Sequence, residues 1–178
     1  MSVTCAKRLR KEIHKLQNSP PDDDIALQAD EDDIRLWKAH IRGPPDTPFA
    51  GGISLTACYY RHPDQLPSCV YEIKITVGQQ YPMVPPSMHF VTKVFHPNVQ
   101  FNTGEICLNI LKKEWSPAWS LQGACRAILA LLAHPEADSP LNCDAGNMIR
   151  AGDMRAFRSV AALYKEELAS KQWPPNRT

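Results

Sequence analysis

The sequence predicts an α+β protein, an antiparallel sheet with helices segregated to one side of it. An amphipathic helical pattern comes first, strand-like segments follow, and helical patterns end the chain. This order is typical of α+β folds and differs from the alternation of α/β folds. The length of 178 residues favours one domain. We expect that domain to span residues 1–172, followed by a short tail over 173–178.

The first half of the chain carries one helical pattern and several strand patterns. Apolar residues recur at steps of three and four from Val3 to Leu16, which predicts a helix over 3–17 that ends at Asn18. No regular element is assigned to the acidic stretch 22–33. Alternating apolar, β-branched and aromatic residues predict strands over 34–41, 53–60, 70–77 and 88–94. We expect a loop over 62–68.

The second half predicts three helices. Apolar residues make a wide face over 121–133, which indicates a central, mostly buried helix that His134 and Pro135 end. A short helix is expected over 142–150. The last helix is expected over 154–171, with Asp153 as its N-cap.

Composition and charge exclude several classes of function. The chain has 20 Lys and Arg against 19 Asp and Glu, so its net charge of +1 does not predict a nucleic-acid partner. The longest clean apolar run, 127–133, is far too short to span a bilayer. The N-terminus has no apolar segment of the signal-peptide kind. No two of the six cysteines have CxxC spacing, which argues against a zinc ribbon or a redox dithiol.

The segment from His96 to Leu111 contains the residues best suited to chemistry. Cys107 supplies a thiol, the most nucleophilic uncharged side chain near neutral pH. Asn98 carries an amide that can donate a hydrogen bond to an oxyanion formed nearby. Residues 102–104 predict a turn between the two. The alternative is that Cys107 is a small buried apolar residue, as free cysteines usually are.

The same segment resembles the active-site signature of ubiquitin-conjugating enzymes, carried by His96-Pro97-Asn98, Gly104 and Ile106-Cys107-Leu108. Flanking motifs agree with the family pattern in the same order along most of the chain. They are Arg42-Gly43-Pro44 with Thr47-Pro48-Phe49, Tyr81-Pro82 with Pro85-Pro86, Trp115-Ser116-Pro117-Ala118, and Asp138-Ser139-Pro140-Leu141. The resemblance implies an N-terminal helix, a four-stranded antiparallel sheet and C-terminal helices.

The resemblance also implies a reaction. Cys107 accepts the C-terminal carboxyl of ubiquitin as a thioester from a ubiquitin-activating enzyme and passes it, with a ligase, to a protein acceptor. ATP is used by the activating enzyme, so no bound cofactor and no metal are expected. Transfer between two thiols is close to isoenergetic and needs no strong base. His96 is therefore read as structural, since Pro97 predicts a turn that satisfies the ring nitrogen locally.

Four further residues take catalytic roles by resemblance. Asn98 either stabilises the oxyanion or holds the loop in shape, and both readings stay open. Asp138 and Ser139 form the gate beside the active site, where Ser139 replaces an acidic residue common in the family. Asn109 replaces a common aspartate. The missing carboxylates are expected to weaken deprotonation of an acceptor lysine and to favour an acceptor cysteine, which is already partly thiolate.

The chain departs from the family pattern in length at two places. Asn98 and Cys107 are nine residues apart, where most members have eight, and the segment between Gly52 and Tyr81 is about twice the usual length, which predicts a protruding loop. By resemblance, the ligase-binding surface consists of Lys7, Arg8, Lys11, Met83, Ser116, Pro117 and Ala118. The basic residues of the first helix can also be read as a solvated face.

Residues 103–112 and 145–154 resemble the peroxisomal members of the family. This implies a role in recycling the peroxisomal import receptor, with a RING-type ligase and a peroxisomal membrane anchor protein as partners. We expect a cytoplasmic protein, peripheral on the cytosolic face of that membrane. The alternatives are another cytosolic conjugation pathway, an inactive ubiquitin-binding variant, which Cys107 argues against, and a cysteine hydrolase, which would need a placed base.

Overall fold

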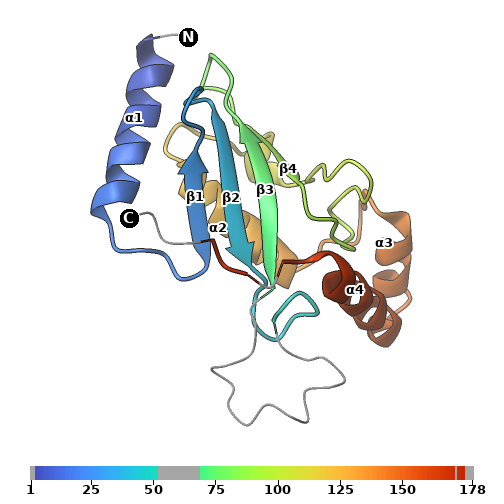
Figure 1. Cartoon of the computed structure of the whole chain (residues 1–178). Coiled ribbons are helices and arrows are strands. Elements are labelled where there is room, and N and C mark those ends of the chain that lie inside the picture. The colour runs from blue at the N-terminus through green and yellow to red at the C-terminus, as the bar shows by residue number, and fades with distance from the viewer. Residues whose placement is uncertain (1–2, 52–68, 171, 175–178) are drawn as a thin grey trace.

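The computed structural model describes residues 3–51, 69–170 and 172–174, and it confirms the α+β class. Its core is a four-stranded antiparallel sheet with the strand order β1-β2-β3-β4. In Figure 1, α2 lies behind the sheet, α1 lies on the side of β1, and α3 and α4 lie together on the opposite side. The expected strand over 53–60 and loop over 62–68 lie outside the described residues.

The sheet is a simple meander. The strands are β1 (Ile25–Ala29), β2 (Leu36–Arg42), β3 (Val70–Thr76) and β4 (Ser87–Phe90), each paired with the next. Burial alternates along β2, where Trp37, Ala39 and Ile41 are covered, because successive side chains of a strand point to opposite faces. The buried face packs against α2, which contacts both β1 and β2.

The helices match the sequence patterns closely. They are α1 (Val3–Asn18), α2 (Leu121–Ala133), α3 (Cys143–Arg150) and α4 (Met154–Leu168). Ser120, Asn142 and Asp153 cap the last three, each accepting a hydrogen bond from the backbone N–H three residues on. The boundaries predicted for the central helix are confirmed at both ends.

One strand was not predicted, and several boundaries differ from the prediction, such as that of the strand expected over 34–41, which is Leu36–Arg42. The first strand is 25–29, inside the acidic stretch, because its short apolar set gains stability from pairing with β2. The strand predicted over 88–94 ends at Phe90, where the Val91 N–H turns to the Glu72 carbonyl at 2.8 Å. The last helix ends at Leu168.

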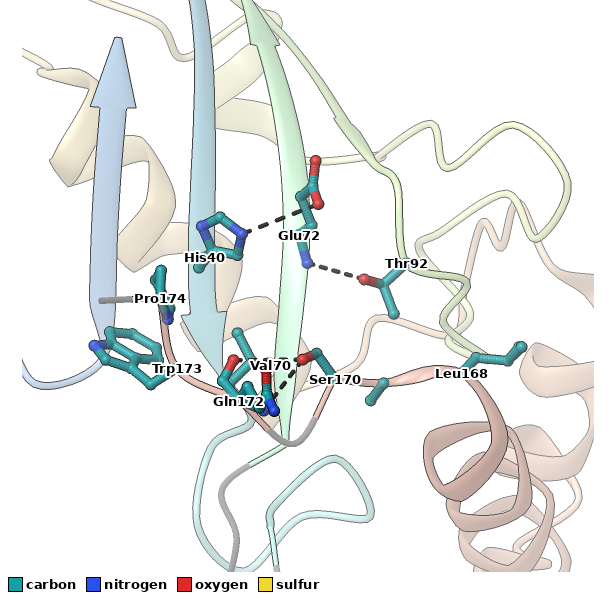
Figure 2. A pocket seen from close by; sticks show the side chains of 10 residues that line it. His40, Val70, Glu72, Thr92, Leu168, Ser170, Gln172, Trp173 and Pro174 are labelled. Carbon is teal, nitrogen blue, oxygen red and sulfur yellow. Dashed lines mark hydrogen bonds and ion pairs between the residues drawn. The ribbon is translucent and has the colours of Figure 1, made fainter. Parts of the chain in front are cut away.

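The C-terminal segment leaves α4 as extended chain and returns to the sheet. Ser170 exchanges two backbone hydrogen bonds with Val70, of 2.8 and 3.1 Å, which accounts for the early end of the helix. The Trp173 ring then packs under the Arg42 guanidinium, 4.5 Å from the ring centroid, so the first residue of the expected tail contacts the sheet. This segment, β2 and β3 line an open pocket of about 350 Å³, whose lining side chains are drawn in Figure 2.

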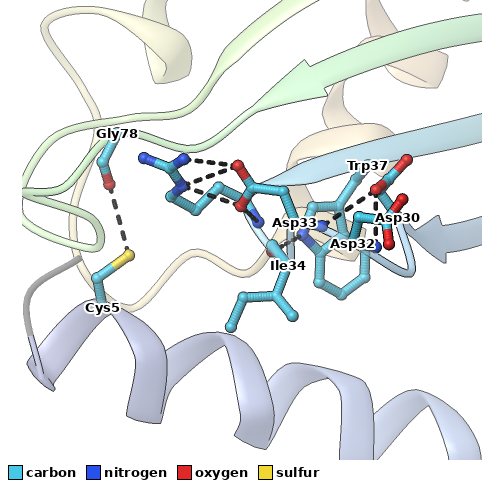
Figure 3. A network of polar contacts seen from close by, with 8 residues as sticks. Cys5, Asp30, Asp32, Asp33, Ile34, Trp37 and Gly78 are labelled. Carbon is cyan, nitrogen blue, oxygen red and sulfur yellow. Dashed lines mark hydrogen bonds and ion pairs between the residues drawn. The ribbon is translucent and has the colours of Figure 1, made fainter.

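The acidic residues before β2 build the turn that leads into it (Figure 3). One carboxylate oxygen of Asp30 accepts hydrogen bonds from the backbone N–H groups of Asp32 and Asp33, at 3.0 and 3.1 Å. Arg35 donates to the Asp33 carboxylate and lowers the pKa of that group to about 2. The Trp37 indole donates to the Ile34 carbonyl at 2.8 Å. The charge run is therefore a turn-forming element.

Candidate active site

The thiol of Cys107 lies at the end of a short hairpin and is half-buried and free. Val99 and Ile106 form an isolated antiparallel bridge, and the Cys107 N–H donates to the Asn98 carbonyl at 2.8 Å. These contacts place Asn98 directly beside Cys107. The two residues that the sequence singled out are therefore neighbours in space.

The extra residue between Asn98 and Cys107 is absorbed in the turn 100–105. The Gln100 side-chain oxygen accepts backbone hydrogen bonds from Asn102 and Thr103, at 2.6 and 2.8 Å. Gly104 closes the turn with a φ of +71°, in the region that favours glycine. A Cβ there would lie 1.9 Å from the carbonyl oxygen of Phe90. The turn thus lies between the Val99–Ile106 bridge partners, and the Cys107 N–H keeps its hydrogen bond to the Asn98 carbonyl.

The Asn98 side chain is only 2% exposed and holds the neighbouring loop. Its Nδ2 donates to the Glu136 carbonyl, and its Oδ1 accepts from the Glu136 N–H, each at 2.8 Å. This reciprocal pair spans 38 residues of sequence and replaces a backbone-to-backbone pairing. Of the two readings, the contacts support the loop-holding one, while one Nδ2 hydrogen is left over for another acceptor.

The predicted gate is held by the turn that contains Pro97 and Asn98. The Pro97 carbonyl accepts hydrogen bonds from the backbone N–H groups of Leu141 and Asn142, at 2.8 and 3.0 Å. Together with the Asn98–Glu136 pair, these bonds fix both ends of the segment that contains Asp138 and Ser139. Both side chains are exposed. Asn109, also exposed, begins a one-turn 3-10 helix just after the nucleophile.

His96 has no access to the reaction. Its ring is fully buried against Phe49, with ring centroids 5.7 Å apart. Its Nδ1 accepts a hydrogen bond from the Asn98 backbone N–H at 3.1 Å, so this ring nitrogen is hydrogen-bonded within the turn, as predicted. Burial lowers the pKa of His96 to about 3, with the Leu131 backbone opposing the shift. The imidazole is therefore neutral near pH 7 and supports the loop from beneath.

Sequence reasoning missed Lys112. Its Nζ donates toward the Cys107 Sγ at 3.8 Å, and its side chain is exposed. The intervening 3-10 helix, Asn109–Leu111, turns the chain back so that a residue five positions on returns to the thiol. Spacing alone gave no signal for this contact, because no helix pattern was recognised between 96 and 120.

Cys125 and Cys143 differ from Cys107 in burial and position. Burial raises the pKa of Cys125 to about 12, and Asp22 adds to the shift, so this thiol on the inner face of α2 is unreactive. Cys143 is exposed at the start of α3, directly after Asn142, whose N–H is bound to Pro97. Cys143 is thus the exposed thiol that lies nearest the gate in sequence, and it is the useful control for Cys107.

The predicted ligase-binding residues come from three elements that the structure brings together. The Trp115 indole donates to the Pro82 carbonyl at 2.8 Å and so joins the 115–119 loop to the turn that presents Met83. Met83 is 72% exposed. Helix α1 approaches the same loop, where Arg8 donates to the Trp119 carbonyl at 2.7 Å. The exposed residues of this surface are Lys7, Lys11, Met83, Pro117 and Ala118, and Ser116 is half-buried.

Arg8 differs from the other basic residues of the first helix. Its guanidinium also donates to Glu12, a carboxylate only 8% exposed, at 2.7 Å. The same Glu12 oxygen accepts the Tyr81 hydroxyl at 2.5 Å, and the other oxygen accepts the Leu121 N–H at 2.8 Å. The sequence gave no sign of this network. Arg8 is therefore occupied beneath the surface that it was expected to present to a ligase.

Outside the surroundings of Cys107, the described residues form no second candidate active site or metal site. The pocket of Figure 2 is lined by His40, Glu72, Thr92 and the C-terminal segment, and none of the residues predicted to be catalytic belongs to it. Within the described ranges, no cluster of His, Cys, Asp and Glu side chains could hold a metal ion. In the same part of the chain, no helix combines the length and apolar character needed to cross a membrane.

Comparison with known proteins now identifies the family. A family model described as "Ubiquitin-conjugating enzyme" matches residues 63–165. "Protein PEROXIN-4" of Arabidopsis thaliana is 49% identical over 88% of this chain and 90% of its own length. "Ubiquitin-conjugating enzyme E2 pex4" of Dictyostelium discoideum is 48% identical over 89% of this chain and 95% of its own.

The solved structures agree with this match. A crystal structure of the H. polymorpha ubiquitin-conjugating enzyme Pex4p in complex with the soluble domain of Pex22p superposes with a TM-score of 0.78. It is 32% identical and covers 94% of this chain and 100% of its own. The chain therefore belongs to the ubiquitin-conjugating enzyme family, transferases that carry ubiquitin as a thioester and need no bound cofactor.

Proposed function

We propose that Cys107 is the residue that carries ubiquitin. The main support is the position of Cys107, whose backbone N–H donates a hydrogen bond to the Asn98 carbonyl. Its thiol is half-buried at the end of the hairpin and is not in a disulfide. In loading, the Cys107 sulfur bonds to the ubiquitin C-terminal carbonyl carbon while the bond to the activating enzyme's thiol breaks. The exchange is thiol for thiol and close to isoenergetic.

In unloading, an acceptor nucleophile attacks the same carbonyl carbon and Cys107 leaves as a thiolate. Asn98 holds the 134–138 loop beside the reacting carbon, and its remaining amide hydrogen is available to a developing oxyanion. Asp138, Ser139 and Asn109 are exposed, and by the family resemblance they flank the thiol where an acceptor approaches. With one carboxylate among these three, the site gives limited help in removing a proton from a lysine.

A charging assay tests this function. The protein is incubated with ubiquitin-activating enzyme, ATP and ubiquitin, and the products are run on non-reducing and reducing gels. The expected result is an adduct of one ubiquitin that thiol reagents remove. An inactive ubiquitin-binding variant would give no adduct, and a cysteine hydrolase would release free carboxylic acid without accumulating one.

We propose further that the protein works in the peroxisomal pathway, in recycling of the import receptor. Support comes from two relatives at 48–49% identity whose names contain peroxin-4 or pex4, and from the Pex4p structure, which was solved with the soluble domain of Pex22p. By this likeness, a membrane-anchor protein holds the enzyme at the cytosolic face of the peroxisome. A RING-type ligase contacts the surface formed by Lys7, Lys11, Met83, Ser116, Pro117 and Ala118.

The recruitment part is tested with vesicles. Protein-free liposomes of peroxisome-like lipid composition should not retain the purified protein in a flotation assay. Vesicles that carry an anchor protein's soluble domain through a lipid-linked tag should retain it. Tight binding to the protein-free liposomes would contradict recruitment by a partner.

A further inference from the structure

The contact between Lys112 and Cys107 points to a residue that acts on acceptor choice. Lys112 Nζ lies 3.8 Å from the Cys107 Sγ, on the exposed side of the nucleophile. Lysine side chains carry a positively charged ammonium group near neutral pH. A fixed cation therefore stands next to the atom to which ubiquitin is attached, on the side that faces solvent and an arriving acceptor.

The neighbours do not bury or fully neutralise this charge. Asn109 and Ser139 are neutral where carboxylates are common in the family, and the exposed acids in the adjoining segments are Glu105, Glu114, Glu136 and Asp138. Lys112 hydrogen-bonds through its side chain to the Cys107 sulfur and through its backbone N–H to the Asn109 carbonyl at 2.9 Å. Its ammonium is thus directed at the sulfur rather than at a carboxylate.

We propose that Lys112 is a specificity-determining residue that disfavours amine acceptors relative to thiol acceptors. The inference rests on the proposed function of Cys107. An arriving lysine is also an ammonium ion before it reacts, and like charges repel at this distance. An arriving cysteine, with an ordinary pKa of about 8.5, is neutral or anionic and meets no repulsion.

The effect of Lys112 on the acceptor can be measured separately from any stabilisation that Lys112 gives to the leaving thiolate. A lysine ammonium first gives one proton to water, which frees the nitrogen lone pair. In both reactions the acceptor sulfur or nitrogen then bonds to the thioester carbon, the bond from that carbon to the Cys107 sulfur breaks, and any proton left on the bonded acceptor atom beyond the product's own passes to water. Stabilisation of the leaving thiolate by Lys112 is common to both and cancels in the ratio of the two rates. The ratio therefore reports on the acceptor alone.

The test measures single-turnover discharge of ubiquitin-charged enzyme onto N-acetyl-lysine amide and N-acetyl-cysteine amide at fixed pH. Thioester loss without acceptor is subtracted, which also removes any self-modification. Removing one unit charge from an exposed site near the reaction is expected to raise the lysine-to-cysteine rate ratio about fivefold in Lys112→Ala. The rise should be larger in Lys112→Glu and absent in Lys112→Arg.

Two controls separate charge from shape. Lys113→Glu alters the next residue, also an exposed lysine, and should leave the ratio unchanged. Hydroxylamine is an amine that is uncharged at neutral pH, so the lysine-to-hydroxylamine rate ratio should also rise in Lys112→Glu. The Lys112→Glu effect should also shrink when salt is raised from low concentration to about 1 M, where the screening length is near 3 Å.

An unchanged lysine-to-cysteine ratio in Lys112→Glu would overturn the inference while leaving the proposed function intact. An equal response of lysine and hydroxylamine would also overturn it, because the effect would then not depend on acceptor charge. If the wild-type protein formed no thiol-sensitive adduct, the proposed function would fail and this inference with it.

Discussion

At the scale of single residues, the active-site loop depends on one amide side chain and one buried imidazole. Asn98 makes two hydrogen bonds to the backbone of Glu136, and His96 receives the backbone N–H of Asn98. Both residues belong to the same three-residue turn. The turn is therefore held by polar groups that a substitution would leave unsatisfied.

Replacing Asn98 should loosen the gate. Asn98→Ala leaves the Glu136 N–H and carbonyl without their partners, so we expect the free energy of unfolding to fall by about 2 kcal/mol. Exchange of the Glu136 amide hydrogen with solvent should become faster. Asn102→Ala, at an exposed position of the nearby turn, should change the free energy of unfolding by less than about 0.5 kcal/mol. Unchanged exchange at Glu136 would rule out the loop-holding role.

His96 should make folding sensitive to mild acid. The pKa of His96 is about 3 in the folded protein and near 6.5 when unfolded, so the unfolded state binds the proton first as pH falls. The stabilising contribution is full above about pH 7 and is lost as pH falls toward 3, with a slope of up to about 1.4 kcal/mol per pH unit.

Urea unfolding at several pH values between 5 and 7 measures this slope. His96→Gln should reduce it, whereas His14→Gln, at an exposed position of α1, should leave it unchanged. If the His96 variant does not fold, nuclear magnetic resonance of the wild type gives the answer. A His96 ring signal that titrates between pH 5 and 8 would contradict the account.

At the scale of elements, Glu12 joins α1 to the rest of the molecule. Its carboxylate accepts hydrogen bonds from Arg8, the Tyr81 hydroxyl and the Leu121 N–H, which places a negative charge at the N-terminus of α2. The Trp115–Pro82 and Arg8–Trp119 bonds extend the same connection to the loop of the ligase-binding surface.

Breaking this connection should be costly. Glu12→Ala leaves three donors without their acceptor in a largely buried site, so we expect the free energy of unfolding to fall by about 3 kcal/mol. Lys11→Ala, on the exposed side of α1, should change the free energy by less than about 0.5 kcal/mol. Both values come from urea denaturation curves. A loss below about 1 kcal/mol in Glu12→Ala would mean that water replaces the carboxylate without difficulty.

At the scale of the whole molecule, local patterns predicted the elements better than the contacts between them. The helix 121–133 was predicted to the residue because its apolar face and its stop at His134 are local signals. The first strand was missed because five residues flanked by acids gain their stability from pairing with β2. That stability depends on tertiary structure.

In the candidate site, too, single residues could be predicted from local patterns, whereas contacts that depend on tertiary structure could not. The resemblance of 96–108 to a family signature was enough to single out Cys107 and Asn98, which the structure places side by side. The network of Glu12 joins residues up to 109 positions apart, and the approach of Lys112 to the thiol depends on a short 3-10 turn. Neither the Glu12 network nor the Lys112 contact produces a periodic pattern in the sequence, so both are visible only in the structure.

The central claim is that Cys107 alone carries ubiquitin, and one measurement tests it most directly. Wild type, Cys107→Ser and Cys143→Ser are charged with activating enzyme, ATP and ubiquitin, and the adducts are analysed by intact mass before and after thiol treatment. We predict a thiol-sensitive adduct for wild type and Cys143→Ser. For Cys107→Ser we predict no adduct or a thiol-resistant oxyester. A thiol-sensitive adduct of unchanged yield in Cys107→Ser would contradict the account and move the active site to another cysteine.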